Sequence, residues 1–327
     1  MNAARCGRLF RLLKKQGLQS AVTCDPSDIL YFTGLRVSGA YLLFKRSSAR
    51  LFLNSLYPCE KKWTTPLREL KNIKLGKTAI EPSKFSLTSI TSFRNMTGCS
   101  IIKKEPLFSR IRAIKEKCEI DKIDKAQKIS RSLCERLRFK EGSTEKDTAY
   151  SILSRSWRLA DGPSFEPIVA FGEKSAYPHH IPAERKYSRG DTALIDMGVI
   201  YKNYHADLTR MKGLFNINIL LGRALAAVKK SRELALAHIR PGAEIGGIAR
   251  MIRDYLANQG FEKNTLHSAG HGVGLDVHEW PGISCGEKER FKKGMVFTLE
   301  PGLYFRGMGG VRVEDVYVLE DKVRILG

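Results

Sequence analysis

Two apolar segments in the second half of the chain are each interrupted by a single carboxylate. Asp196 lies within TALIDMGVIY and Glu300 within GMVFTLEPGLYF. An isolated charge is costly to bury in such a strand, so it needs a cation or hydrogen-bond donors beside it. The alternative is that each residue ends a strand and points into water. Any fold proposed for this chain must account for these two carboxylates.

The turns that follow these segments give each carboxylate an acidic neighbour. A symmetric hairpin around Tyr201-Lys202 places Asp196 opposite Asp207. A second hairpin, around the glycine-rich turn of YFRGMGGVRV, places Glu300 opposite Glu314. Like charges directly across a ladder destabilise it unless something positive lies between them. We therefore predict that divalent metal ions bind between these carboxylates.

Histidines are concentrated in the same half of the chain. None precedes His179, and three share the segment HSAGHGVGLDVHEWPG, namely His267, His271 and His278. The glycines of this segment lack the GxGxxG spacing of a nucleotide-binding loop. Clustered histidines can be polar loop residues, but beside the carboxylates they indicate a metal or catalytic site. Mostly oxygen ligands with one histidine suit Mn²⁺ or Co²⁺, with Zn²⁺ or Fe²⁺ possible, rather than one structural zinc ion.

At 327 residues the chain is long enough for two domains. Short apolar runs that alternate with helical stretches predict a small α/β domain in residues 1–112. The boundary is expected just before an amphipathic helix at about 114–138. Further helices are expected near 145–160, 217–238 and 244–258, with strands at EPIVAFG and TALIDMGVIY and a strand-rich C-terminal segment.

The net charge of +22 is concentrated in residues 1–112, which hold 21 Lys and Arg against 6 Asp and Glu. These basic residues are dispersed and lack interleaved aromatics, so we interpret them as a solvated surface and expect no specific nucleic-acid partner. Weak polyanion binding by this region stays open. No apolar run reaches the roughly 20 residues that span a bilayer, so no membrane partner is expected. Seven scattered cysteines without CxxC spacing fit a reducing cytoplasm.

Several stretches resemble the pita-bread metallopeptidases, specifically the prolidase (Xaa-Pro dipeptidase) and aminopeptidase P branch. The matching stretches, in the family's order, are SAYPHH, LIDMGVIYKNYHADLTR, HSAGHGVGLDVHEWP, GMVFTLEPGLY and GGVRVED. DPSDILYFTGL resembles the family's N-terminal domain. The resemblance implies an α+β architecture, with a smaller creatinase/prolidase-like α/β domain at 1–112 and a pita-bread catalytic domain at 113–327.

The resemblance also implies a dinuclear metal site built from five residues. Asp196 would bind one ion, while Asp207 and Glu314 would bridge both. His271 and Glu300 would complete the shell of the other ion. By this resemblance and by ligand type, two Mn²⁺ ions are expected, with Co²⁺ or Zn²⁺ as alternatives.

Catalytic roles follow from the same resemblance. A hydroxide bridging the two ions would attack the peptide carbonyl, His278 would stabilise the tetrahedral intermediate, and Glu300 would carry the proton. His179 and His267 match further active-site histidines that line the substrate pocket. Arg312 would hydrogen-bond a ligand carboxylate and fix its orientation. The remaining histidines match no role: His180, His205 and His238.

The implied function is metal-dependent hydrolysis of Xaa-Pro bonds, in a peptide with proline in the second position. HEWP favours the dipeptidase over the aminopeptidase. Two alternatives are weighed. Methionine aminopeptidase shares the ligands, but the N-terminal domain and HEWP oppose it. A non-catalytic binding protein or chaperone on the same fold is opposed by the presence of all five ligands. A cytoplasmic homodimer is expected, the dimer by resemblance alone.

Overall fold

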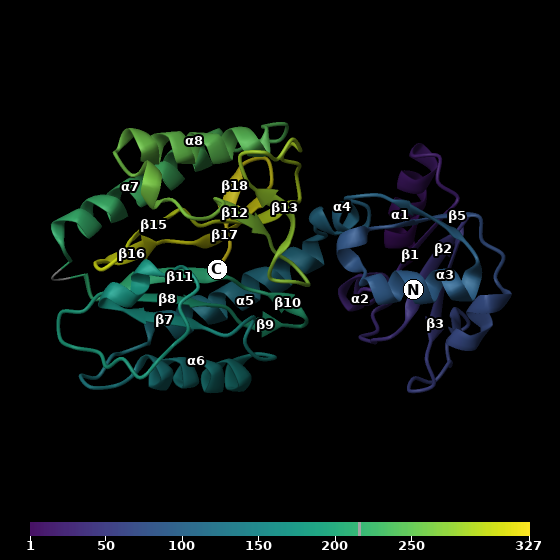
Figure 1. The fold of residues 1–327 in the computed structure, drawn as a ribbon, viewed down its shortest axis with the longest axis horizontal. Helices are drawn as coiled ribbons and strands as arrows, with labels where there is room; N and C mark the ends of the chain where they lie inside the picture. The colour runs from purple at the N-terminus through teal and green to yellow at the C-terminus, as the bar shows by residue number, and fades with distance from the viewer. Residues whose placement is uncertain (215–216) are drawn as a thin grey trace. The chain divides into compact units, whose positions relative to one another are not determined.

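The computed structural model describes residues 1–214 and 217–327, and the chain divides into two units, Met1–Arg112 and Ala113–Gly327 (Figure 1). The first unit is built on a mixed six-stranded sheet of order β4-β3-β2-β1-β5-β6. Its elements in chain order are α1 (Ala3–Lys15), β1 (Ser20–Thr23), α2 (Pro26–Thr33), β2 (Tyr41–Lys45), β3 (Ser48–Leu53), β4 (Thr64–Pro66), η1 (Leu67–Asn72), β5 (Lys77–Ile80), η2 (Pro82–Lys84), α3 (Leu87–Thr97), β6 (Ser100–Lys103) and α4 (Phe108–Ala113).

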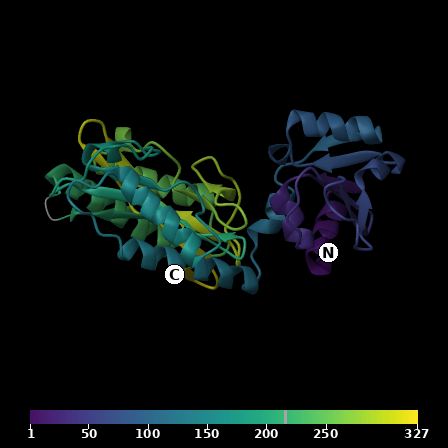
Figure 2. The ribbon, with the colours of Figure 1, turned by 90° about the horizontal axis from the view of Figure 1, so that it is seen from below.

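Both faces of this sheet are covered by helices, as Figure 2 shows for α3 on one side and α1 on the other. Alternate residues of β2 pack on opposite faces. Tyr41 and Leu43 share a buried cluster with Phe93 of α3. The Phe44 ring instead contacts Phe32 of α2, with centroids 4.8 Å apart. A strand that is buried on both faces needs apolar residues at consecutive positions, which explains the unbroken apolar runs of this region.

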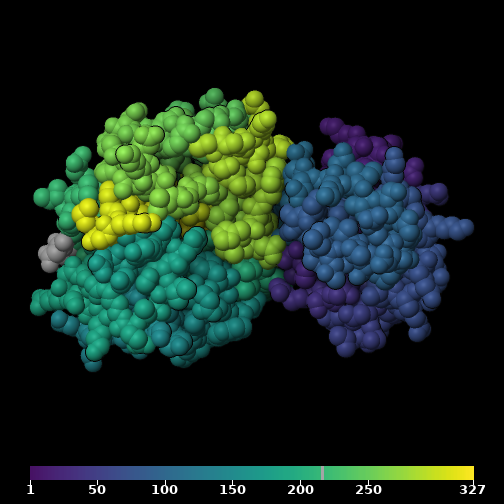
Figure 3. All heavy atoms as spheres, in the orientation of Figure 1, coloured from purple at the N-terminus to yellow at the C-terminus, as the bar shows by residue number. Residues whose placement is uncertain are grey.

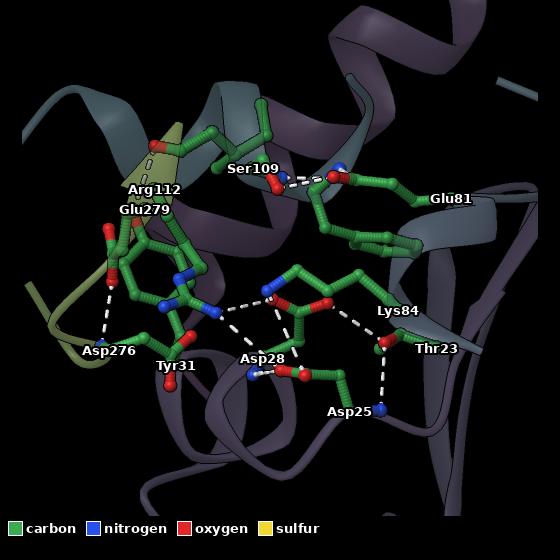
Figure 4. A network of polar contacts seen from close by, with 12 residues as sticks. Thr23, Asp25, Asp28, Tyr31, Glu81, Lys84, Ser109, Arg112, Asp276 and Glu279 are labelled. Atoms are coloured by element: carbon green, nitrogen blue, oxygen red, sulfur yellow. Dashed lines mark hydrogen bonds and ion pairs between the residues drawn. The ribbon is translucent and has the colours of Figure 1, made fainter. Parts of the chain in front are cut away.

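The buried carboxylates of the N-terminal unit have partners within that unit (Figure 4). Asp28, on α2, accepts hydrogen bonds from Thr23 Oγ1 and Arg112 Nη1, each at 2.9 Å. Glu81 accepts the backbone N–H groups of residues 107–109, at the start of α4. These contacts connect α2, β1 and α4 through charge-assisted hydrogen bonds.

The C-terminal unit contains a three-stranded sheet of order β11-β8-β7 and a five-stranded sheet of order β13-β12-β14-β17-β18, with the pairs β9–β10 and β15–β16. Its elements are α5 (Lys117–Glu135), α6 (Glu145–Leu159), β7 (Ile168–Phe171), η3 (Gly172–Ala176), β8 (Ala193–Met197), β9 (Ile200–Tyr201), β10 (Tyr204–His205), β11 (Leu208–Lys212), α7 (Ile219–His238), α8 (Ile245–Asn258), η5 (Glu262–Asn264), β12 (Gly270–Gly272), β13 (Glu279–Ile283), β14 (Val296–Leu299), β15 (Gly302–Phe305), β16 (Gly309–Arg312), β17 (Asp315–Leu319) and β18 (Val323–Ile325).

The strands of this unit lie between two pairs of helices. Figure 1 shows α7 and α8 on one side of them and α5 and α6 on the other. In the space-filling view, the last part of the chain, in yellow, lies between the green region of α7 and α8 and the teal region below it (Figure 3). In the part of the chain that the structure describes, no helix has both the length and the apolar character required to cross a bilayer.

The helix expected at 114–138 is shorter in the structure, where α5 begins at Lys117 and ends at Glu135. Glu116 and Glu119 form a reciprocal capping box at its start. Ile114 instead forms a β-bridge with Met295. Ile114 fits the apolar pattern of the helix because it also packs against the core of this unit, although it precedes the helix. The other three expected helices agree with α6, α7 and α8 to within two residues at each end.

Candidate metal centre

The five residues expected to bind metal come together in the C-terminal unit. They are Asp196 on β8, Asp207 directly before β11, His271 on β12, Glu300 directly after β14 and Glu314 directly before β17. Ligand atoms of Asp196, Asp207 and Glu314 all lie within 4.8 Å of one another, and so do those of His271, Glu300 and Glu314. The two groups share Glu314, so one carboxylate connects two adjacent candidate ion sites.

The alignment expected for Asp196 and Asp207 is wrong. Strands β8 and β11 pair Asp196 with Thr209. The turn lies at Lys202-Asn203, where both residues have positive φ (49° and 69°), rather than at Tyr201-Lys202. Two consecutive left-handed residues form the hairpin turn that matches strand twist. The alignment therefore slips by two positions, which makes the two carboxylates diagonal neighbours on one face.

The register expected around Gly307 is confirmed, since β15 pairs with β16 and β14 with β17 in that register. Glu300 and Glu314 stand between these two ladders. The Glu300 N–H donates to Ala269 O, directly before β12 (2.9 Å), and the Glu314 N–H donates to Thr209 O of β11 (3.2 Å). The interruption of the ladder at this level puts both carboxylates beside three different strands, where they can meet the remaining ligands.

Two buried oxygens of the cluster, Asp196 Oδ1 and Glu314 Oε1, have no hydrogen-bond partner within residues 1–214 and 217–327. The other oxygen of each carboxylate is satisfied. Arg312 Nη2 donates to Asp196 Oδ2 (2.6 Å), and Thr209 Oγ1 donates to Glu314 Oε2 (2.7 Å). Leaving a buried carboxylate oxygen without a partner is unfavourable, and carboxylate oxygens are the donors that hard divalent ions prefer. The residues present therefore fit a metal site.

The electrostatics of the cluster support the same fit. Burial, and then the neighbouring carboxylates, hold the pKa of Asp207 and of Glu314 well above their usual values. Burial also raises the pKa of Asp196, although the Arg312 guanidinium opposes this shift. Without cations, the cluster must keep protons to limit its negative charge. Divalent ions would displace those protons on binding.

His271 is oriented toward the carboxylates by its own backbone. Its Nδ1–H donates to Gly272 O (3.1 Å), which leaves Nε2 at 3.3 Å from Glu300 Oε1 and 3.5 Å from Asp207 Oδ2. Burial alone would lower the pKa of His271, but the Glu300 hydrogen bond and the Asp207 charge raise it to about 9. Burial opposes ionisation of Glu300, yet the His271 hydrogen bond and charge lower its pKa. Nε2 is thus the atom placed to bind metal.

Arg312 connects the acidic cluster to a histidine of the expected substrate pocket. Its guanidinium donates to Thr209 Oγ1 (3.1 Å) and to Tyr304 OH (2.7 Å). The Tyr304 hydroxyl also hydrogen-bonds His267 Nε2 (2.8 Å). Since the hydroxyl accepts from Arg312, its own proton is donated to His267, whose Nδ1–H donates to Ser268 O (2.8 Å). Burial raises the pKa of Tyr304 to about 12, so this hydroxyl stays protonated.

Sequence reasoning did not single out Thr209 or Tyr304. The correct hairpin register would have identified Thr209, because it lies directly opposite Asp196. Tyr304 lies in the EPGLY stretch just after Glu300, yet no sequence pattern indicates that its hydroxyl lies between Arg312 and a histidine.

His278 and His179 lie at the same site. The His278 ring packs edge-on against the His271 ring, with centroids 4.2 Å apart. Burial lowers the pKa of His278 and of His267, and the charge of the exposed His179 adds a smaller effect in the same direction on both. His179 is therefore within electrostatic range of both other histidines. The structure brings the five ligands together with Arg312, His267 and His278. His179 directly follows Pro178, whose carbonyl accepts from Arg312 Nη1.

This combination of fold and acidic site defines a metallopeptidase. Residues 121–321 match metallopeptidase family M24, and residues 5–114 match the creatinase/prolidase N-terminal domain. The chain belongs to metallopeptidase family M24.

Similar proteins come from both branches that the sequence indicated. The Xaa-Pro dipeptidase of Pyrococcus furiosus is 28% identical over 331 residues, which cover 97% of this chain and 95% of that protein. The structure of a dipeptidase from Pyrococcus horikoshii matches with a TM-score of 0.90 at 31% identity, covering 98% of this chain and 97% of that one. An X-Pro aminopeptidase from Thermotoga maritima matches with a TM-score of 0.82 at 28% identity and the same coverage. These matches confirm the expected fold, a creatinase-type domain followed by a pita-bread domain.

Proposed function

We propose that this protein hydrolyses the peptide bond before proline in Xaa-Pro substrates, using two bound divalent metal ions. The observation that carries the proposal is the buried acidic cluster, in which Asp196 and Glu314 each present an oxygen without a hydrogen-bond partner in the described chain. Relatives named for Xaa-Pro cleavage support the substrate class. HEWP favours a dipeptidase over an aminopeptidase.

Five residues would hold the ions, with Glu314 common to both groups of ligand atoms: Asp196, Asp207, His271, Glu300 and Glu314. A donor set of four carboxylates and one imidazole supports Mn²⁺ first, with Co²⁺ or Zn²⁺ as alternatives. When bound, such ions supply Lewis acidity, which activates water and polarises the scissile carbonyl.

The protein's own groups would move the proton and stabilise the developing charge. Glu300 would accept a proton and pass it to the leaving nitrogen. His278, packed against His271, would donate a hydrogen bond to the oxyanion. Arg312 would hold Asp196 in place through its 2.6 Å hydrogen bond.

His179 and His267 would line the pocket that receives the substrate. The two hydrogen bonds of His267, to Tyr304 and Ser268, favour a neutral ring of one tautomer and a fixed orientation. We also propose that residues 1–112 and 113–327 are separate domains, which the division of the structure after Arg112 supports. The homodimer and the cytoplasmic location remain predictions, from the resemblance and from cysteine usage respectively.

The decisive experiment is a metal-reconstitution assay on the purified chain. The protein is stripped with a chelator and reloaded separately with Mn²⁺, Co²⁺ or Zn²⁺, and we expect about two ions bound per chain. Substrates are Xaa-Pro dipeptides, longer Xaa-Pro peptides, matched Xaa-Ala peptides and peptides that begin with Met-Ala. We expect hydrolysis only before proline, with dipeptides preferred.

Each other result has a distinct meaning. No hydrolysis with any of the three metals contradicts the enzyme proposal. Cleavage restricted to longer Xaa-Pro peptides overturns the dipeptidase preference. Cleavage after methionine without a requirement for proline supports the methionine aminopeptidase alternative.

A further inference from the structure

The segment that carries His179 is anchored on both sides. It lies between η3 and β8 and reads Tyr177-Pro178-His179-His180-Ile181. On the side before His179, Arg312 Nη1 donates to Pro178 O (3.3 Å). The contacts on the other side come from α6, at the first residue of that helix.

Glu145 provides this second anchor. Its side chain is fully buried and accepts three hydrogen bonds. Phe171 N–H donates to Oε1 (2.8 Å), while Ala183 N–H (3.0 Å) and His180 Nε2 (2.7 Å) both donate to Oε2. The His180 side chain is only 12% exposed. A buried carboxylate with this many donors is well satisfied, so Glu145 is a rigid attachment point rather than a free base.

His179 lies between these two anchors. Its own ring is exposed, and no hydrogen bond of that ring is recorded in the described structure. Before His179, Arg312 holds the Pro178 carbonyl; after it, Glu145 holds the His180 ring and the Ala183 backbone N–H. An exposed ring with fixed neighbours keeps its place over a pocket at little entropic cost on binding. Loss of either anchor is expected to let the segment move.

We propose that His180 and Glu145 form a positioning pair that holds the His179 segment over the metal site, so that His179 meets the peptide substrate in a fixed orientation. This inference rests on the proposed function. His180 does not touch the reacting atoms, and its effect on turnover passes through His179.

The test compares His180→Ala with the conservative His180→Gln, whose amide N–H₂ can still donate to Glu145. The matched control is His238→Ala, because His238 is an exposed histidine whose Nδ1 bonds Leu234 O of its own helix. Backbone hydrogen exchange is measured over residues 177–183. We expect faster exchange there in His180→Ala, recovery in His180→Gln and no change in the control.

Kinetics then separate positioning from general stability through a double-mutant cycle with His179→Ala. With His179 present, His180→Ala should lower kcat/KM for an Xaa-Pro dipeptide about tenfold, mainly through KM. In the His179→Ala background the same change should have an effect of less than about twofold, because the two residues act through one contact.

The possible results are distinguishable. Equal losses in both backgrounds, or unchanged exchange of residues 177–183 in His180→Ala, overturn the positioning role. A wild-type protein that hydrolyses no Xaa-Pro peptide contradicts the proposed function instead. In that case the exchange comparison still decides whether the pair holds the segment.

Discussion

Both units bury carboxylates, but those of the acidic cluster in the C-terminal unit are compensated differently from those of the N-terminal unit. In the N-terminal unit, Asp28 is 0% exposed and lies against the Arg112 guanidinium, and Glu81 accepts the backbone N–H groups at the start of α4 (Figure 4). In the C-terminal unit, Asp207 and Glu314 are similarly buried, but the groups around them are largely other carboxylates. The first arrangement is complete within the protein, whereas the second requires cations from outside.

The contrast recurs between two adjacent residues of one strand region. Glu314 faces the acidic cluster, whereas Asp315 receives ion pairs from three arginines on three elements, Arg131, Arg210 and Arg232. Successive side chains of a strand point to opposite faces. Burial and sequence position alone therefore do not separate a structural carboxylate from a metal ligand. The sign of the surrounding charge does.

Glu300→Gln tests the metal-requiring region with the largest expected effect. The amide cannot accept the proton, so kcat for an Xaa-Pro dipeptide should fall by about 10²–10⁴-fold. Stability should change far less, because Glu300 lies at the edge of the cluster and is partly exposed. Steady-state kinetics and thermal unfolding of the same preparation check this. A variant with the wild-type rate would remove Glu300 from the mechanism.

Arg112→Met tests the internally compensated region. It removes the guanidinium that donates to the buried Asp28 and leaves only the weaker effect of Lys84, so the free energy of unfolding of the N-terminal unit should fall by about 3–5 kcal/mol. Denaturant unfolding measures the loss, and Arg112→Met with Asp28→Asn is the control that should recover part of it. Metal binding should be unchanged. If the single and double variants have the same free energy of unfolding, the unpaired charge of Asp28 is not the cause of the lost stability.

The pH dependence of this region has a definite sign. Burial raises the pKa of Asp28 from 3.8 to about 6, against the opposing charge of Arg112. Because the folded pKa exceeds the unfolded one, the stability gained from protonation is fully present below pH 3.8 and is lost as the pH rises through about 6. The loss caused by Arg112→Met should therefore be largest at neutral pH and smaller in acid.

Metal addition should raise the stability of the C-terminal unit and leave the stability of the N-terminal unit unchanged. At a free-ion concentration of 100 times Kd the gain is about 2.7 kcal/mol, and a chelator should reverse it. The raised pKa values of Asp207 and Glu314 mean that protons leave when ions bind. Metal affinity should therefore fall as the pH is lowered. The measurement is thermal unfolding with and without Mn²⁺ at two pH values. An unfolding midpoint that does not change when Mn²⁺ is added contradicts the proposed metal site.

Much of the candidate site could be predicted from sequence, because its ligands interrupt apolar strands. A carboxylate such as Glu300 within an apolar segment is conspicuous, and the glycine-rich turn after it set the register that the structure has. The register of Asp196 was mispredicted because the two candidate turn centres differ by one residue. Only the backbone shows that Lys202-Asn203 adopts positive φ. Moving the turn by one residue shifts the residue paired with Asp196 by two positions, from Asp207 to Thr209.

What the sequence could not indicate are contacts between distant segments that share no pattern. Glu145 reaches His180 because α6 begins beside that segment, and Tyr304 reaches His267 across two separate strand regions. The capping box at Glu116 was also visible only as two glutamates, so the start of α5 was placed too early. Hydrophobic periodicity reports burial, and burial continues past the end of a helix.

Arg312→Lys is the prediction with the smallest expected effect. It tests the comparison most directly, because Asp196 has features both of a carboxylate compensated within the protein and of a metal ligand. One of its oxygens accepts from Arg312, as in a compensated pair, while the other has no partner in the described chain. Lysine keeps the charge but loses the planar fork that contacts Asp196, Thr209 and Tyr304 together. Metal affinity should fall about 10–100-fold, as for other residues that orient a ligand.

The matched control for this change is Arg324→Lys, an exposed arginine of β18 paired with Glu320, which should leave metal affinity unchanged. Isothermal titration with Mn²⁺ measures both variants. Unchanged affinity in Arg312→Lys would mean that charge alone keeps Asp196 ionised and oriented, which would place Asp196 with Asp28 among the internally compensated carboxylates. A loss confined to Arg312→Lys would show that the geometry of its hydrogen bonds prepares the free oxygen of Asp196 for a cation.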